Sequence, residues 1–262
     1  MKTETQKDKS TYVSRIEGHA LVLGGSGGIG SEIVRALVAN GARAVSFTYG
    51  KNRVSAEALA LELTKQNIQV HFGAIDQSDS NSVTRFLEEA VADTGHEITV
   101  AVNSIGISPN VPLEEQTIEE WRKVFEVNTI GSFFSARTIA MRMKEKKVQG
   151  SIVLITSTNG INSQSQISAH YDASKAAQGH AMKILAEFFA PHGIRINGVA
   201  PGWIDTALND TLPDDERAKE TAKIWSGRFA TPAEVASFVA LIAGSGGSYV
   251  YGQNLMIDGG YR

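Results

Sequence analysis

Short apolar segments alternate with helix-like segments along almost the whole chain, and this alternation constrains the fold more than any other feature. The segments that predict buried strands are 19–24, 44–49, 69–74, 99–102, 151–156, 195–199 and 254–257. Strands that alternate with helices pair in parallel through right-handed crossovers, and the helices then cover both faces of the sheet. The pattern predicts an α/β fold of the Rossmann type, with a doubly wound, parallel, seven-stranded sheet.

The chain of 262 residues has no internal repeat and no linker rich in Pro, Gly or Ser. We therefore expect a single domain at 15–262, preceded by a flexible N-terminal tail at 1–14, which is too polar for a signal peptide. Residues 203–228 are more polar than the rest and follow the sixth strand. Ligands of open α/β sheets bind beyond the carboxyl ends of the strands, so this segment is placed to act as a lid.

Composition excludes several classes of function. The net charge is −3 without a long basic run, which argues against nucleic acid as a partner. No apolar stretch reaches the ~18 residues of a membrane span. The chain has no cysteine, so it has no disulfide or thiolate chemistry, and a cytoplasmic location is compatible with this. The histidines lack metal-ligand spacing, and no metal is expected.

A glycine-rich turn follows the first predicted strand and opens a helix. Its glycines include Gly24, Gly28 and Gly30, with Ser26 and Ile29 between them. Such a turn lets a pyrophosphate approach the backbone at the positive end of a helix. A flexible strand–helix turn is the alternative, but the position after the first strand favours a nucleotide cradle.

The end of the second strand bears on the choice of nicotinamide cofactor. Enzymes that use NAD place an acidic side chain here for the ribose 2′-hydroxyl. This chain instead has Tyr49, Lys51, Asn52 and Arg53 after Thr48. Lys and Arg can pair with a 2′-phosphate, so we predict NADP(H) rather than NAD(H). Solvated loop charges are the alternative reading of these residues.

Tyr171 and Lys175 are the candidate catalytic pair. Tyrosine is a weak acid with a pKa of about 10, and a nearby ammonium group favours the phenolate. The two residues would share one face of a helix, because residues four apart are neighbours there. Ser157 ends an apolar strand, where site residues of α/β folds are expected, and Thr158 is the second choice for its hydroxyl role. In isolation, an exposed Tyr–Lys pair and a turn serine would be the plainer readings.

The order of these motifs resembles the short-chain dehydrogenase/reductase family over about residues 15–262. The resemblance rests on the glycine turn, Asp76, Asn103 with Gly106, Asn128, Ser157, the Tyr171/Lys175 pair, Pro201-Gly202 and the ending 252–260. Within the family it is nearest to 3-oxoacyl-(acyl carrier protein) reductases and their relatives.

The resemblance implies a role for each residue. Tyr171 is the general acid or base, Lys175 lowers its pKa and bonds the nicotinamide ribose, and Ser157 polarises the substrate carbonyl. Asn128 holds a water in a proton relay to Lys175. The residues implied in cofactor binding are Gly24, Ser26, Gly28, Ile29, Gly30, Tyr49, Lys51, Asn52, Arg53, Asp76, Asn103, Gly106, Tyr171, Lys175, Pro201, Gly202, Ile204 and Thr206.

The chain departs from the family pattern at several positions. Leu23 replaces a threonine before the cradle, and Ile105 replaces a smaller alanine beside the cofactor ribose. The loop 158–170 is one residue longer than expected. His192 stands where an arginine for an acyl carrier protein is expected, so that partner rests on the positive charge of Lys146 and Lys147.

The predicted function is reduction of a carbonyl, in a 3-oxoacyl thioester, to a hydroxyl with NADP(H). A small ketone, sugar or polyol is the alternative substrate, and a non-catalytic NADP(H)-binding sensor is the alternative of another class. An isomerase or dehydratase is less favoured, because the chain has no room for a larger substrate domain. The resemblance also implies a homotetramer built on long helices at about 117–145 and 171–190 and on the last strand. Trp203 and Trp225, which flank the lid, could contact substrate or pack the lid onto the domain.

Overall fold

The predicted sheet is present with all of its strands parallel. The computed structural model describes residues 14–162, 165–206 and 212–262. The strands follow the order β3-β2-β1-β4-β5-β6-β7. Their bounds are β1 His19–Leu23, β2 Ala44–Tyr49, β3 Gln69–Ala74, β4 Ile98–Asn103, β5 Gly150–Ile155, β6 Ile194–Pro201 and β7 Asn254–Ile257. The order reverses between β1 and β4, which is where a doubly wound sheet binds its ligand.

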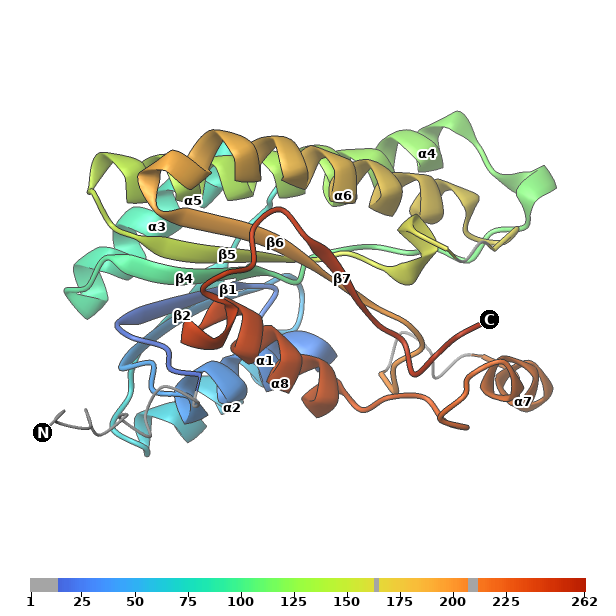
Figure 1. Ribbon diagram of the computed structural model, residues 1–262, viewed down its shortest axis with the longest axis horizontal. Helices are drawn as coiled ribbons and strands as arrows, with labels where there is room; N and C mark the ends of the chain where they lie inside the picture. Colours follow the sequence, from blue (N-terminus) through green and yellow to red (C-terminus); the bar gives the residue numbers. More distant parts are fainter. Residues whose placement is uncertain (1–13, 163–164, 207–211) are drawn as a thin grey trace, which may run out of the picture.

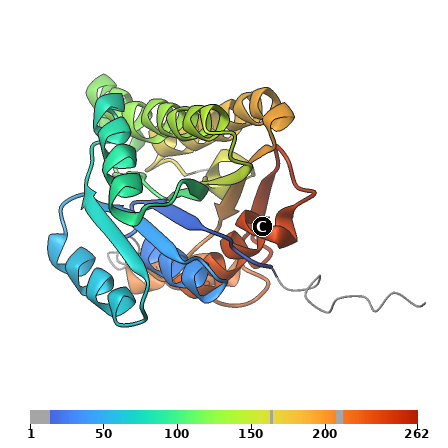
Figure 2. The same cartoon turned by 90° about the vertical axis from the view of Figure 1, so that its left-hand side faces the viewer.

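Helices cover both faces of the sheet (Figures 1 and 2). Their bounds are α1 Gly28–Ala39, α2 Arg53–Thr64, α3 Ser80–Thr94, α4 Ile118–Phe125, α5 Ser132–Glu145, α6 Ala169–Phe189, α7 Asp214–Ala222 and α8 Pro232–Ala243. One apolar core joins the sheet to α1, α2 and α8, and a second joins it to α3, α5 and α6. Strands buried on both faces explain the nearly continuous apolar runs of the sequence.

The sheet register brings distant segments to one edge. Leu23 of β1 pairs with Asn103 of β4, and Asn103 pairs with Leu154 of β5. The residues after these three strands therefore meet at the carboxyl ends, as do those after Pro201 of β6. These are the segments that hold the glycine turn, Ser157 and Pro201-Gly202.

Two helices, α4 and α8, begin with a capping box. Thr117 and Thr231 each accept a bond from the backbone N–H three residues on, and the Glu120 and Glu234 carboxylates accept the N–H of the cap residue. The long helix predicted at 117–145 is interrupted, however, because Glu126–Gly131 forms a π-helix between α4 and α5.

Hydrogen bonds tie Ser14 and Arg195 to α8. Most of the predicted tail lies outside the described residues, but Ser14 donates to the carbonyl of Leu241 in α8. In β6, the buried Arg195 donates to four carbonyls at the end of α8, those of Ile242, Ala243, Gly244 and Gly247. Arg195 therefore satisfies carbonyls that the last turn of α8 cannot bond internally.

The predicted lid contains α7 and its flanking turns, apart from residues 207–211, which lie outside the described part. The chain's last residues lie against it. The backbone of Trp225 and Ser226 bonds to Gly260 and Gly259, and Arg262 bonds to the carbonyl of Lys223. The C-terminal segment follows β7 and thus connects this strand to the lid.

Candidate active site

The glycine turn has the geometry of a phosphate cradle. Gly24 has φ +77, which favours glycine, and its N–H donates to the hydroxyl of Thr48 on the neighbouring strand at 2.8 Å. A Cβ at Gly30 would lie 2.1 Å from the Gly24 carbonyl oxygen, so the turn closes too tightly for any side chain. Thr48 thus supplies a hydroxyl next to the position where Leu23 replaces the expected threonine.

The turn fits a dinucleotide. Gly27 precedes α1 and, as glycine, cannot cap the helix with a side chain, which leaves the first N–H groups for an anionic ligand. Gly28 faces Thr206 across a narrow gap, since a Cβ there would lie 3.3 Å from the threonine methyl group. Ile29 lines the pocket described below, and Ser26 bonds through its N–H to the carbonyl of Thr48.

The basic residues after β2 are exposed. Asn52 caps α2 by accepting the N–H of Ser55 at 3.0 Å, and Arg53 is bonded to Glu57 at 2.7 Å. Lys51 is exposed between them and Tyr49, the last residue of β2. Two cations therefore lie beside the N-terminus of α2, at the carboxyl end of the strand where the adenosine ribose is expected.

Asp76 follows β3, and Asn103 is the last residue of β4. Asp76 is exposed and accepts the N–H of Ser78, whereas Asn103 is buried and bonds to Gln77 and to the N–H of Ile105. Asn103 thus fixes the chain after β4.

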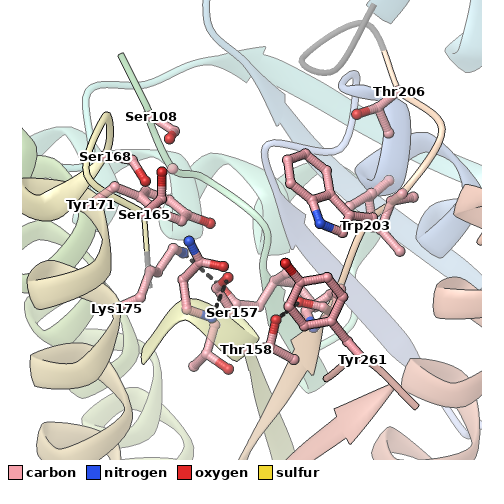
Figure 3. Close-up of a pocket in the computed structure, with 18 of the residues that line it drawn as sticks. Ser108, Ser157, Thr158, Ser165, Ser168, Tyr171, Lys175, Trp203, Thr206 and Tyr261 are labelled. Carbon is pink, nitrogen blue, oxygen red and sulfur yellow. Dashed lines mark hydrogen bonds between the residues drawn. The ribbon is translucent and has the colours of Figure 1, made fainter. Parts of the chain in front are cut away.

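Ser157, Tyr171 and Lys175 line one pocket of about 310 Å³ at the carboxyl ends of the strands. Figure 3 shows Tyr171 and Lys175 on one side of this cavity and Ser157 at its floor. The Lys175 ammonium lies 5.7 Å from the centre of the Tyr171 ring, as expected for neighbours on α6. The sequence prediction that these side chains share a site therefore agrees with the geometry.

Burial dominates the electrostatics of the pair. It raises the pKa of Tyr171, while a bond with Ser157 lowers it and the carboxylate of Asp172 raises it. Burial also lowers the pKa of Lys175 to about 7. Tyr171 therefore stays protonated near neutral pH, and burial outweighs any lowering of its pKa by Lys175.

Lys175 is held by two acceptors, the Ile155 carbonyl at 2.8 Å and the Gln178 side chain at 3.1 Å. Gln178 in turn donates to Ser132 at 2.7 Å, and all of these groups are buried. A buried polar chain therefore runs from Lys175 through Gln178 to Ser132.

Asn128 lies in the π-helix and is fully buried. Its amide exchanges two bonds with the backbone of Ile107, both at 2.8 Å, and donates to Ser174 at 3.0 Å. A Cβ at Gly106 would lie 3.3 Å from the Lys175 nitrogen and 3.5 Å from the Asn128 oxygen. Gly106 thus lies between the two side chains that the predicted water relay would connect.

The loop before Tyr171 is tied to α6 by Asp172. Its carboxylate accepts bonds from the Asn159 side chain, the Ser165 N–H and the Ser168 hydroxyl, at 2.7 to 3.0 Å. Thr158 also lines the pocket, but its hydroxyl donates to the Pro201 carbonyl at 3.3 Å. Ser157 is therefore better placed than Thr158 for the hydroxyl role.

The far wall of the pocket follows β6. Pro201, Gly202, Ile204 and Thr206 all line it. Trp203 lines it too and stacks on Phe229 with ring centres 5.2 Å apart. Trp225 is not among the lining residues of the described part and lies instead against the Arg262 guanidinium.

Sequence reasoning missed several residues of the site, among them Gln178, Glu220 and Tyr261. Glu220 and Tyr261 line the pocket, and Gln178 contacts Lys175. A glutamine on the buried face of α6 was the one available signal, because a buried amide must find partners. Nothing local marks Glu220 and Tyr261, which meet across 41 positions of sequence.

The described residues contain neither a membrane-spanning helix nor a candidate metal cluster. In the part of the chain that the structure describes, no helix combines the length and apolar character needed to cross a bilayer. Within residues 14–162, 165–206 and 212–262, no group of three His, Asp or Glu side chains could hold a metal ion. Arg228 forms a salt bridge with Glu234 at the lid base.

Comparison with known proteins places this geometry in a family. A family described as "Enoyl-(Acyl carrier protein) reductase" matches residues 24–262. Cis-4-hydroxycyclohexanecarboxylate dehydrogenase of Sinomonas cyclohexanicum is 35% identical, over 92% of this chain and 95% of the relative. A 3-oxoacyl-[acyl-carrier-protein] reductase of Salmonella typhimurium is 34% identical, over 92% of this chain and 96% of the relative.

A solved structure shares the fold as well. The short-chain dehydrogenase/reductase of Serratia marcescens superimposes with a TM-score of 0.86 at 31% identity, covering 95% of this chain and 99% of the other. The two sequence relatives act on different compounds, so identity at this level does not fix the substrate. The chain belongs to the short-chain dehydrogenase/reductase family, whose members are oxidoreductases that act on carbonyl or CH–OH groups with NAD(H) or NADP(H).

Proposed function

We propose that this protein is an NADP(H)-dependent carbonyl reductase in which Tyr171 is the acid. The observation that carries the proposal is the convergence of Ser157, Tyr171 and Lys175 on one pocket beside the glycine cradle. The bound nicotinamide would supply hydride to the carbonyl carbon. The cradle, Lys51, Arg53 and the segment 201–206 would hold the cofactor, with Asp76 at the adenine edge.

The protein's own residues act on the carbonyl oxygen. Ser157 donates a hydrogen bond to this oxygen and stabilises the charge that develops on it. Tyr171 delivers its proton to the same oxygen, and its raised pKa keeps that proton in place until it is needed. Lys175 and Asn128 would return a proton to the phenolate through water near Gly106.

Two substrate classes are candidates. A 3-oxoacyl thioester is supported by the similarity to the Salmonella reductase. A small ketone, sugar or polyol is supported by the polar lining of the pocket, which includes Ser108, Ser165 and Ser168. Consumption of NADPH with acetoacetyl thioester, compared with a hydroxylated ketone, tests both. Tight NADPH binding without turnover of any carbonyl would instead favour the non-catalytic sensor.

The positions of Lys146, Lys147 and His192 do not support acyl carrier protein as a partner. Lys146 and Lys147 follow α5 just before β5, and His192 lies just before β6. They therefore lie at the amino ends of the strands, opposite the pocket.

A homotetramer and a cytoplasmic location stay predictions. Exposed apolar side chains on the three predicted contact segments support the tetramer, namely Ile130, Phe134, Ile184, Phe188 and Met256.

Replacing Lys51 and Arg53 together with glutamine is expected to raise the KM for NADPH by tenfold or more, because the 2′-phosphate loses two cationic partners. The KM for NADH should change little. Lys65→Gln is the matched control, since it removes a charge at the far end of α2. Initial rates with both cofactors measure the effect, and a wild-type protein that strongly prefers NADH would contradict the cofactor assignment.

Gln178→Leu is expected to move the alkaline limb of the kcat/KM profile down by about one pH unit. The glutamine oxygen favours the charged form of Lys175, so its loss lowers a pKa that burial already holds at about 7. Gln178→Glu should move the limb upward, because a carboxylate favours the ammonium more strongly. Profiles that coincide with the wild type in both variants would show that Gln178 does not act on Lys175.

A further inference from the structure

Figure 3 shows Trp203 and Tyr261 on the pocket wall opposite Tyr171. Glu220 also lines the pocket and bonds to both, and the three residues are here called the clasp. The Glu220 carboxylate accepts a bond from the Tyr261 hydroxyl at 2.5 Å and from the Trp203 indole N–H at 3.2 Å. The Lys223 ammonium donates to its other oxygen at 2.5 Å. Three donors from separate parts of the chain thus converge on one carboxylate that borders the pocket.

The clasp is fixed from both sides. Tyr261 belongs to the C-terminal segment whose backbone pairs with residues 223–226, including a bridge between Ile224 and Tyr261. Trp203 is stacked on Phe229, on the other side of the lid base. The three side chains are therefore held before a ligand arrives, as a specific binding site requires.

The pKa shifts of Glu220 and Tyr261 indicate which of the two groups carries a proton. Burial raises the pKa of Glu220, but the bonds from Lys223, Tyr261 and Trp203 together hold it below its ordinary value. Burial and the Glu220 bond raise the pKa of Tyr261. Glu220 is therefore ionised and Tyr261 protonated near neutral pH, with the phenol proton directed at the carboxylate.

The clasp consequently offers acceptors to the pocket rather than donors. The carboxylate has about four acceptor positions, and three are used by the bonds above. Lys175 is already bonded to Ile155 and Gln178, and Lys223 uses one of its three N–H donors on Glu220. A substrate hydroxyl could donate to the remaining Glu220 acceptor and accept from Lys223, whereas a substrate carboxylate could only accept from Lys223 and would lie beside the charge of Glu220.

We propose that the clasp binds a hydroxyl group of the substrate, so that the preferred substrates are uncharged ketones or aldehydes that carry a hydroxyl away from the reacting carbonyl. The inference rests on the proposed carbonyl reductase function and chooses between its two substrate candidates. The acyl part of a 3-oxoacyl thioester has no hydroxyl or N–H group beyond its ketone, so it can donate no hydrogen bond to the clasp.

The test compares methyl ketones of equal length that end in a hydroxyl, a methyl or a carboxylate group, with NADPH as reductant. The pairs 4-hydroxy-2-butanone with 2-pentanone and 5-hydroxy-2-pentanone with 2-hexanone differ by one such exchange, and 4-oxopentanoate is the anionic probe. For at least one pair, kcat/KM should favour the hydroxyl compound by about tenfold. The anionic probe should be the poorest substrate.

Variants assign this preference to the clasp. Tyr261→Phe and Glu220→Gln should each reduce the hydroxyl-to-methyl ratio severalfold, with thermal unfolding used to verify that the variants fold. Asp215→Asn is the control, since it breaks the exposed pair of Asp215 with Lys219 on the same helix and should leave the ratio unchanged.

The two proposals fail in different ways. Wild-type turnover of both members of each pair with equal kcat/KM would overturn the clasp and leave the carbonyl reductase standing. A hydroxyl preference that survives in Tyr261→Phe and Glu220→Gln would also overturn it. Intact NADPH binding with no turnover of any ketone, aldehyde or thioester would overturn the reductase and the clasp together.

Discussion

Replacing Tyr171 with phenylalanine is expected to lower kcat for carbonyl reduction by on the order of a thousandfold, while the affinity for NADPH stays unchanged. The variant keeps the ring that lies near Lys175 and removes the phenol proton alone. The negative charge that develops on the substrate oxygen then loses its proton donor, because Ser157 is a far weaker acid and Lys175 is held by Ile155 and Gln178.

Single-turnover rates and a separate NADPH titration measure the two effects. Tyr249→Phe is the matched control, because its side chain is 99% exposed and lies outside the pocket. A Tyr171→Phe protein with wild-type kcat would remove Tyr171 from the chemistry. A fall in NADPH affinity as large as the fall in kcat would instead give Tyr171 a role in cofactor binding.

Arg195→Met is expected to lower the free energy of unfolding by about 3–5 kcal/mol. The methionine fills much of the same volume but leaves the buried carbonyls of Ile242 and Ala243 without this donor. The carbonyls of Gly244 and Gly247 each lose one of two donors, since they also accept backbone N–H groups. Arg195→Lys should recover part of the loss, because an ammonium provides three donors but cannot spread them as the planar guanidinium does.

Urea unfolding at one fixed protein concentration measures these differences. Arg122→Met is the control, since Arg122 is exposed and pairs only with Glu119 in the described residues. Its loss should stay below about 0.5 kcal/mol. An Arg195→Met protein as stable as this control would show that water or the neighbouring backbone satisfies the end of α8.

Much of the sheet was predictable, because strands buried on both faces leave apolar runs that glycine and polar residues end. The strands predicted at 44–49, 69–74 and 254–257 have those bounds in the structure. The helix at 117–145 was predicted without its π-helical part, since no local residue pattern distinguishes that hydrogen-bonding shift from a regular helix.

Part of the candidate site was likewise predictable from the sequence, and part was not. Ser157, Tyr171 and Lys175 were predictable because each stands at a fixed place in the strand–helix order, and the pocket brings all three together. The clasp was not, because Glu220 and Tyr261 meet only after the C-terminal segment has folded back along the lid. Arg195 was hidden for a related reason, as its partners are carbonyl groups and carry no sequence signal.

The π-helix at Glu126–Gly131 makes this part of the chain sensitive to length. A π-helical turn holds about one more residue than an α-helical turn, so loss of one residue here would restore regular winding and leave α4 and α5 nearly in place. The side chains within the segment would change face, and Asn128 would lose its bonds with Ile107. Substitutions can be tolerated on the outer face of this segment, but deletion of a single residue should be eliminated by selection during the divergence of related chains.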